Sequence, residues 1–351
     1  MNRTLTRRDF VHRASALATT ATLAGALPAP ARAIAAQAAA SAPAHPRRID
    51  VHHHLLPPEY VKAVGNAALG APIGRSSGPS WTVADSLEAM DRFGIETAIT
   101  SISSPGIPLE DPKAVQRVAR ACNEFARQMT VDHPGRFGVF AVLPLPDVAM
   151  SLDEVNYAYD VLHADGIVLH TNYRALYLGD PHFAPLMEEL NRRRAVVFVH
   201  PTVCTCTLGA IPGLPPASIE YPHDTTRTIA SLLFNGAFKN NPDIRFIFSH
   251  AGGTIPFLVN RIAALPGTAP EGPLPLLRRQ YYDLAQSANP QAMGPLLGMV
   301  NVSQVVFGTD FPFVRAIDTV VDGIAHARLQ AADVQKIGRD NALALFPRLA
   351  S

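Results

Sequence analysis

Residues 47–54 read RRIDVHHH, a short run in which apolar and polar residues alternate before three consecutive histidines. This alternation predicts a β-strand, and the prolines at 57 and 58 predict that it passes into a loop. Because side chains alternate between the two faces of a strand, His52 and His54 share one face and His53 lies on the other.

Seven similar runs follow, separated by segments with apolar residues at helical spacing. The predicted strands after the first are 97–103, 136–144, 166–172, 195–201, 244–250, 281–285 and 304–310. The predicted helices are 85–94, 113–129, 151–162, 183–194, 225–238, 254–265, 289–300 and 331–346. Eight strands alternating with helices predict an α/β fold, a (β/α)₈ TIM barrel. A doubly wound sheet is the alternative, but no G-x-G-x-x-G turn follows the first strand.

The first 33 residues have the features of an export signal. TRRDF at 6–10 is a twin-arginine pattern, the run 14–27 is uncharged, and ARA at 31–33 offers a cleavage site. We expect a signal peptide at 1–33, export to the periplasm or beyond, a flexible leader at 34–46 and a single barrel domain at 47–351. A poorly ordered amphipathic tail is the alternative for the first segment. Removal of residues 1–33 changes the formal charge from +1 to −3.

Several classes of protein are disfavoured by composition. No basic stripe with interleaved aromatic residues suggests a nucleic-acid partner. No later run is apolar and long enough to span a bilayer, so we expect a soluble mature protein. The three cysteines, an odd number, predict no closed disulfide framework. Cys122 is expected in the core, and Cys204 and Cys206 in a pocket wall, with a metal or redox role as the alternative.

Polar residues lie where several predicted strands end, which in a TIM barrel is the reactive face. They are His52 and His54 after the first strand, His200 after the fifth, His250 after the sixth and Asp310 after the eighth. Three neutral imidazoles and one carboxylate suit zinc or a similar divalent ion. We therefore expect His52, His54, His200 and Asp310 to bind one metal ion; a hydrogen-bonded core role for each histidine is the alternative.

Two long loops, 55–81 and 201–224, are expected to cover the mouth of the barrel and the substrate. Arginine binds carboxylates through two parallel donors, so Arg174 and Arg227 are the expected substrate contacts, with Arg75 as a further candidate. Pairing with solvent or a helix end is the alternative for each. Asp283, in the seventh strand, is expected to support a metal ligand by a hydrogen bond, with a hydrogen bond that serves packing alone as the alternative.

Four stretches carry a resemblance to a known family: IDVHHH (49–54), VFVHPT (197–202), IRFIFSHAGG (244–253) and VVFGTDFPF (305–313). In this order they resemble the amidohydrolase superfamily, in the branch of aminocarboxymuconate-semialdehyde decarboxylase. The resemblance implies that His250 is the catalytic histidine beside the metal. Strand four, GIVLHTNYR, lacks the lysine that bridges two metals in many members, which implies one ion, zinc or alternatively manganese. It also implies a homo-oligomer, a dimer.

Segments 171–202 and 224–254 resemble 6-methylsalicylate decarboxylases. The resemblance implies a metal-dependent decarboxylase of a small aromatic or unsaturated carboxylic acid. Loss of CO₂ requires a proton on the carbon that carried the carboxylate, and both His250 and Asp310 are candidate donors. The same residues would serve a hydrolase of a lactone, ester or amide. A barrel that keeps the metal without turnover is the third alternative.

Overall fold

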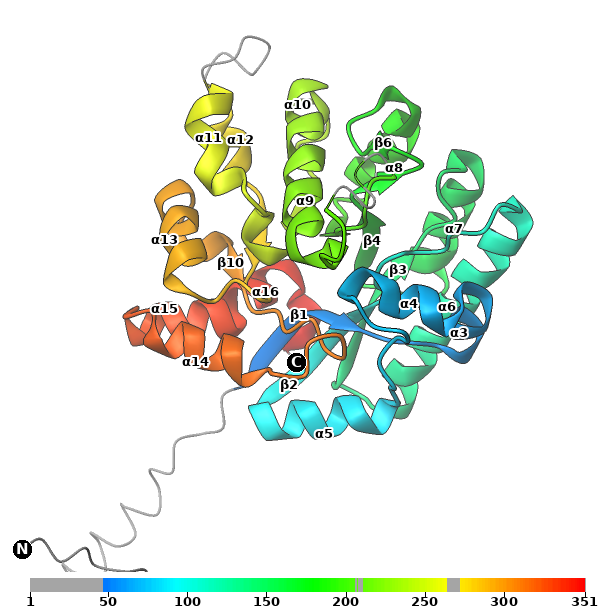
Figure 1. Cartoon of the computed structure of the whole chain (residues 1–351), viewed down its shortest axis with the longest axis horizontal. Coiled ribbons are helices and arrows are strands. Elements are labelled where there is room, and N and C mark those ends of the chain that lie inside the picture. Colours follow the sequence, from blue (N-terminus) through cyan, green and yellow to red (C-terminus); the bar gives the residue numbers. More distant parts are fainter. Residues whose placement is uncertain (1–46, 206, 208–210, 264–271, 351) are drawn as a thin grey trace, which may run out of the picture. The chain divides into compact units, whose positions relative to one another are not determined.

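Eight parallel strands form the central sheet, in the order β1-β2-β3-β4-β7-β8-β9-β10 (Figure 1). Their bounds are β1 Arg48–His54, β2 Ile95–Ser101, β3 Phe137–Val142, β4 Gly166–His170, β7 Val196–His200, β8 Arg245–Phe248, β9 Tyr281–Asp283 and β10 Val305–Val306. Every predicted strand is present, and each overlaps its predicted range. The α/β prediction is therefore confirmed.

The computed structural model describes residues 47–205, 207, 211–263 and 272–350. The predicted signal peptide and leader lie outside these residues, so both stay predictions. Within the described part, no helix is both long and apolar enough to cross a membrane.

Backbone hydrogen bonds between β1 and the segment around β10 close the sheet into a barrel. Val51 N donates to Phe307 O at 3.0 Å, and Asp310 N donates to His52 O at 2.8 Å. His54 N donates to Phe311 O at 2.7 Å. These bonds bring the end of the last strand against the histidines of the first, and the TIM barrel is confirmed.

Helices surround the strands (Figure 1). They are α5 Val83–Phe93, α6 Pro112–Asp132, α7 Val148–Asp160, α8 Ala184–Arg192, α9 Pro216–Phe234, α10 Ala237–Asn240, α11 Ile255–Ala263, α12 Leu274–Leu277, α13 Pro290–Met299, α14 Asp318–His326, α15 Ala331–Gln335 and α16 Asn341–Leu345. Polar side chains cap several of them: Thr82 and Asp85 form a capping box on α5, and Asp111, Asp147 and Asn289 begin α6, α7 and α13.

The C-terminal segment, which ends in a short 3-10 helix at Pro347–Ala350, packs against the start of β4 and against β3. Arg348 pairs with Asp165, the residue before β4. The ring of Phe346 lies 5.8 Å from that of Phe140, a residue of β3. The predicted helix at 331–346 is broken into α15, a short π-helix at Lys336–Asp340 and α16.

Two expectations about the connecting segments were wrong, and one helix was missed. The loop 55–81 contains two helices, α3 Pro58–Val64 and α4 Asn66–Gly70. The second loop was expected to continue to residue 224, but helix α9 already begins at Pro216. The helix starts this early because it accommodates Pro222 in its interior. Helix α14 was not predicted, because its glycine weakens the helical pattern. That Gly323 is required by packing: a Cβ there would lie 1.8 Å from Ala288 O.

Cys122 lies in the core as expected and is a free thiol, 2% exposed. Cys204 is buried, and Cys206 lies outside the described residues, so the expectation for this pair stays a prediction.

We expect Cys122 to resist alkylation in the native protein. Burial raises the pKa of its thiol to about 12, and the thiolate is the reactive form. Iodoacetamide labelling at pH 8, followed by mass spectrometry, should modify Cys122 slowly until urea is added. Equal labelling rates with and without urea would contradict this prediction.

Candidate metal centre

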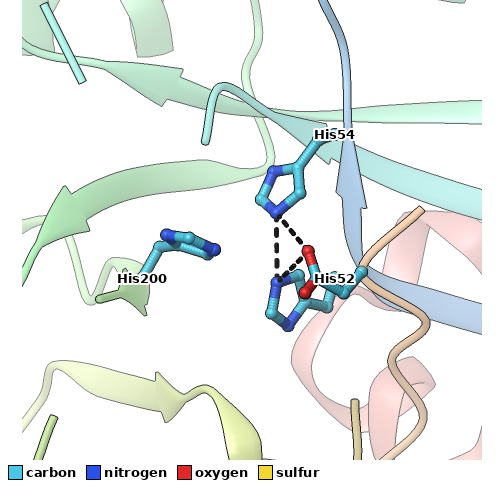
Figure 2. A group of neighbouring side chains, drawn as sticks. His52, His54 and His200 are labelled. Carbon is cyan, nitrogen blue, oxygen red and sulfur yellow. Dashed lines mark hydrogen bonds and ion pairs between the residues drawn. The ribbon is translucent and has the colours of Figure 1, made fainter. Parts of the chain in front are cut away.

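Three histidines and one aspartate meet at the carboxyl ends of the strands. His52 and His54 come from β1, His200 ends β7, and Asp310 follows β10. All four side chains are buried, and one ligand atom from each lies within 4.8 Å of the others. Figure 2 shows the rings of His52, His54 and His200 pointing toward one another. The structure thus brings together the four residues predicted to bind the metal.

Each ring is held through the nitrogen that faces away from this centre. His52 Nδ1 donates to Asp283 Oδ2 at 2.8 Å, and His54 Nδ1 donates to Ser101 O at 3.2 Å. His200 Nδ1 donates to Pro201 O at 2.8 Å. With Nδ1 protonated, each Nε2 keeps its lone pair free for a metal ion. The predicted support from Asp283 is present in the structure.

The donor set fits a divalent cation. His52 Nε2 and His54 Nε2 face each other at 3.1 Å, and His54 Nε2 lies 3.1 Å from Asp310 Oδ1. Two lone pairs at this distance repel, so the two nitrogens must share either a proton or a metal cation. Burial opposes a charge on His52, but the carboxylates of Asp283 and Asp310 outweigh it and raise the pKa of His52 to about 10, so a metal ion bound at Nε2 would take the place of a proton there. Burial lowers the pKa of His200 well below its usual value, so this ring is a neutral ligand.

His53 points away from this centre, toward α5. Its Nδ1 donates to Asp50 Oδ2 at 3.0 Å, and Ser86 Oγ donates to its Nε2 at 2.9 Å. Asp50 also accepts from the Thr309 hydroxyl at 2.6 Å and from His52 N at 3.0 Å. Asp50 therefore ties β1 to the strand end that carries Asp310. Sequence reasoning missed it, although a buried aspartate two residues before H-x-H was a visible signal.

The two oxygens of Asp310 have different surroundings. Oδ1 faces the histidines of β1, whereas Oδ2 accepts a 2.7 Å hydrogen bond from Gln286 Nε2 and lies 3.6 Å from His250 Nε2. Although burial opposes its ionisation, neighbouring His52 and His250 hold the pKa of Asp310 well below its usual range. Gln286 was not predicted; it follows β9 by three residues, in a segment where the sequence carries no recognisable motif.

His250 lies beside the ligand set. Both ring nitrogens are buried and have no hydrogen-bond partner among the described residues. Its backbone N donates to Asp283 Oδ1 at 3.0 Å, so Asp283 holds His52 through one oxygen and His250 through the other. His250, Gln286 and Asp310 all have φ between 53° and 63°, a left-handed conformation that costs free energy for residues with a Cβ. Such strain gathers at sites whose geometry matters for function.

A cavity of about 240 Å³ opens onto the centre. Its walls include His200 and Asp310, and both covering segments contribute to it as expected. The segment 55–81 supplies Leu69, Pro72, Ile73 and Arg75, and the segment 201–224 supplies Pro215, Ala217, Ser218 and Tyr221. Phe313 lines the same cavity, 5.5 Å from the His54 ring.

The predicted substrate arginines lie further out. Arg174, 58% exposed, pairs with Glu110 at 2.9 Å on the rim of a neighbouring cavity. Arg227 lies on α9, where its Nη1 is 3.7 Å from both Asp224 Oδ1 and Glu220 Oε2. Their roles in substrate binding stay predictions, and Arg75 is the arginine that lines the cavity at the metal centre.

Replacing Gly308 with alanine is expected to displace the ligands. A Cβ there would lie 2.8 Å from His52 Cβ and 3.1 Å from Asp283 Cβ, and both residues are needed to orient the centre. We expect metal affinity, measured by competition with a chromophoric chelator, to fall roughly 10-fold or more. Gly294→Ala is the control, because a Cβ at that position has nothing within 4 Å. Unchanged affinity in Gly308→Ala would contradict the prediction.

Comparison with known sequences gives consistent matches. The amidohydrolase family model matches residues 49–348. Decarboxylase yanB of Aspergillus niger is 41% identical over 324 residues, covering 86% of this chain and 88% of that protein. The 6-methylsalicylic acid decarboxylase acuB of Aspergillus aculeatus is 38% identical over 321 residues, covering 86% and 96%.

Solved structures share the fold. A crystal structure described as amidohydrolase II superimposes with a TM-score of 0.78 at 28% identity, covering 87% of this chain and all of that one. A dihydroxybenzoic acid decarboxylase from Polaromonas sp. JS666, solved with manganese and the inhibitor 2-nitroresorcinol, has a TM-score of 0.75 at 23% identity, with 86% and 97% covered.

Proposed function

Because the chain belongs to the amidohydrolase family, we propose that its metal centre decarboxylates 2-hydroxybenzoic acids with a substituent at position 6. The protein is a metal-dependent carboxy-lyase that acts on an aromatic acid. The substrate class within that activity is the proposal. It is supported by the likeness to a 6-methylsalicylic acid decarboxylase over nearly that protein's whole length.

We propose one divalent ion per chain, held by His52, His54, His200 and Asp310. Zinc suits three imidazoles and a carboxylate. Manganese is the second candidate, since a dihydroxybenzoic acid decarboxylase of the same fold contains it. When bound, the ion supplies a Lewis acid that orients the substrate and stabilises negative charge as the C–C bond breaks.

We propose His250 as the residue that protonates the ring carbon. Breaking the bond to CO₂ leaves its electron pair on that carbon, and the carbon takes a proton as the pair forms a C–H bond. Both oxygens of Asp310 are engaged, one by the histidines of β1 and the other by Gln286. The buried ring nitrogens of His250 form no hydrogen bond within the described residues, and Nε2 lies 3.6 Å from Asp310 Oδ2. Solvent then returns a proton to His250.

The test is a panel of acids given to metal-replete protein: 6-methylsalicylate, 2,6-dihydroxybenzoate, salicylate and 4-hydroxybenzoate. We expect CO₂ release from the first two and the least from 4-hydroxybenzoate, which lacks the ortho oxygen. A parallel panel of lactones and aryl esters tests the hydrolase alternative. Cleavage of these without CO₂ release from any acid would overturn the proposal.

We also propose export through the twin-arginine pathway and assembly as a homodimer. The first rests on the pattern at residues 6–10 and the uncharged run that follows it. Mass spectrometry of protein recovered from the periplasm of an expressing bacterium tests export and cleavage of the signal. Light scattering of the same protein tests the dimer. An uncleaved chain retained in the cytoplasm, or a monomer, would contradict them.

A further inference from the structure

A second cavity of about 570 Å³ lies beside the metal pocket. Pro72 and Ser104 line both. Most of the rest of its wall comes from α4 and from the ends of β2, β3, β4 and β7 and the segments that follow them. The two cavities therefore lie at the same end of the barrel and share part of their lining. The metal ligands His200 and Asp310 line the smaller one.

Hydroxyl groups and one imidazole lie where the two cavities meet. Ser104 Oγ and Thr202 Oγ1, from the segments after β2 and β7, form a 3.2 Å hydrogen bond there. His170 lines the second cavity, and its ring centroid lies 6.1 Å from that of the metal ligand His200. His170 Nε2 donates to Ser103 O at 3.3 Å, and Ser103 lines the metal pocket. His170 and the Ser104–Thr202 pair therefore connect residues of the metal centre with the lining of the second cavity.

The lining of the second cavity is mainly apolar. Its apolar residues include Ile107, Leu109, Leu143, Leu145, Val203 and several prolines. Arg174 and Glu110 carry the charges in this lining and pair with each other at 2.9 Å, with side chains 58% and 91% exposed. The interior thus suits an uncharged hydrocarbon group, because the charged groups stay in solvent at its rim.

The sizes of the two cavities support a shared occupant. Ligand pockets commonly enclose about 300–1,000 Å³, and the metal pocket alone, at about 240 Å³, is smaller than this range. A single substituted ring at the metal would fill it. A longer substituent leaving the ring along the wall at Pro72 and Ser104 would enter the second cavity.

We propose that this second cavity binds the apolar substituent, an alkyl chain or a second ring, of an aryl carboxylic acid whose carboxylate lies at the metal. The inference rests on the proposed function and narrows its substrate class to 6-substituted acids with substituents larger than methyl. Each buried methylene adds to affinity through the hydrophobic effect.

Binding measured by calorimetry tests the proposal separately from turnover. The ligands are 6-methylsalicylate and 2-hydroxy-6-pentylbenzoate, and the protein is the full chain loaded with one metal. We expect the pentyl acid to bind at least tenfold more tightly to the wild type. Ala68→Trp, on α4, and Ile107→Trp, after β2, fill the second cavity and should abolish this difference while leaving the affinity for the methyl acid within about twofold.

Ala67→Trp is the matched control. Ala67 is the preceding residue of the same short helix and is exposed, so its variant should keep the preference for the pentyl acid. Equal affinities of the wild type for both acids, or a preference that survives both filling variants, would overturn the proposal. A change of molecular mass in Ala68→Trp without a change in acid affinity would assign the cavity to contact between copies instead. Chain-length-dependent binding without CO₂ release would refute the proposed function alone.

Discussion

His250→Asn is expected to lower kcat for 6-methylsalicylate decarboxylation by at least about 100-fold while leaving about one metal ion per chain. Loss of a positioned proton donor costs roughly 10²–10⁴ in rate. Asparagine suits the φ of 54° at this position better than most residues, so the backbone should keep its conformation. The measurements are CO₂ release and metal analysis on the same preparation.

His163→Asn is the matched control for this variant. His163 also has a φ of 54°, but it is exposed in the loop that leads from α7 into the amino end of β4, whereas His250 follows the carboxyl end of β8. Its replacement should change neither activity nor metal content. Full activity in His250→Asn would remove His250 as the donor and leave Asp310; loss of the metal would show that His250 is needed to hold the ion.

The sequence was most informative where one local rule governs the structure. Alternation along a strand separated His52 and His54 from His53, and the structure places the rings as that rule requires. The carboxyl ends of parallel strands meet at one end of a barrel, so His200 and Asp310, far apart in the chain, could be assigned to the same centre. Fold class and the metal cluster were therefore predictable without coordinates.

Contacts across the barrel were harder to predict. Gln286 bonds to Asp310 only because β9 and β10 are neighbours and because the backbone at Gln286 is left-handed, and no sequence pattern marks either fact.

The ion pairs of Arg227, in contrast, could have been predicted from the sequence. Asp224 lies three residues before Arg227 and Glu220 seven, spacings that place all three on one face of a helix, so pairing within α9 was visible in the sequence once α9 was extended to Pro216.

The histidines of β1 give the second large effect. His52→Ala is expected to reduce metal affinity more than about 100-fold, because a ligand itself is lost and not merely the group that orients it. His53→Ala should keep about one ion per chain, since the His53 ring contacts Asp50 and Ser86 instead of the metal centre. Metal content after purification without chelators, followed by chelator competition, measures both.

His53→Ala is expected to destabilise the fold without loss of the metal. This effect distinguishes His53 from the metal ligands His52 and His54. The variant leaves a buried Asp50 oxygen without a hydrogen bond from His53, a loss of about 1–3 kcal/mol in the free energy of unfolding. His53→Gln, which can still donate toward Asp50, should recover part of it. Urea denaturation of the metal-loaded proteins should therefore show His53→Ala less stable but metal-replete. If His53→Ala instead lost the ion as completely as His52→Ala, the division of the three histidines by strand face would be wrong.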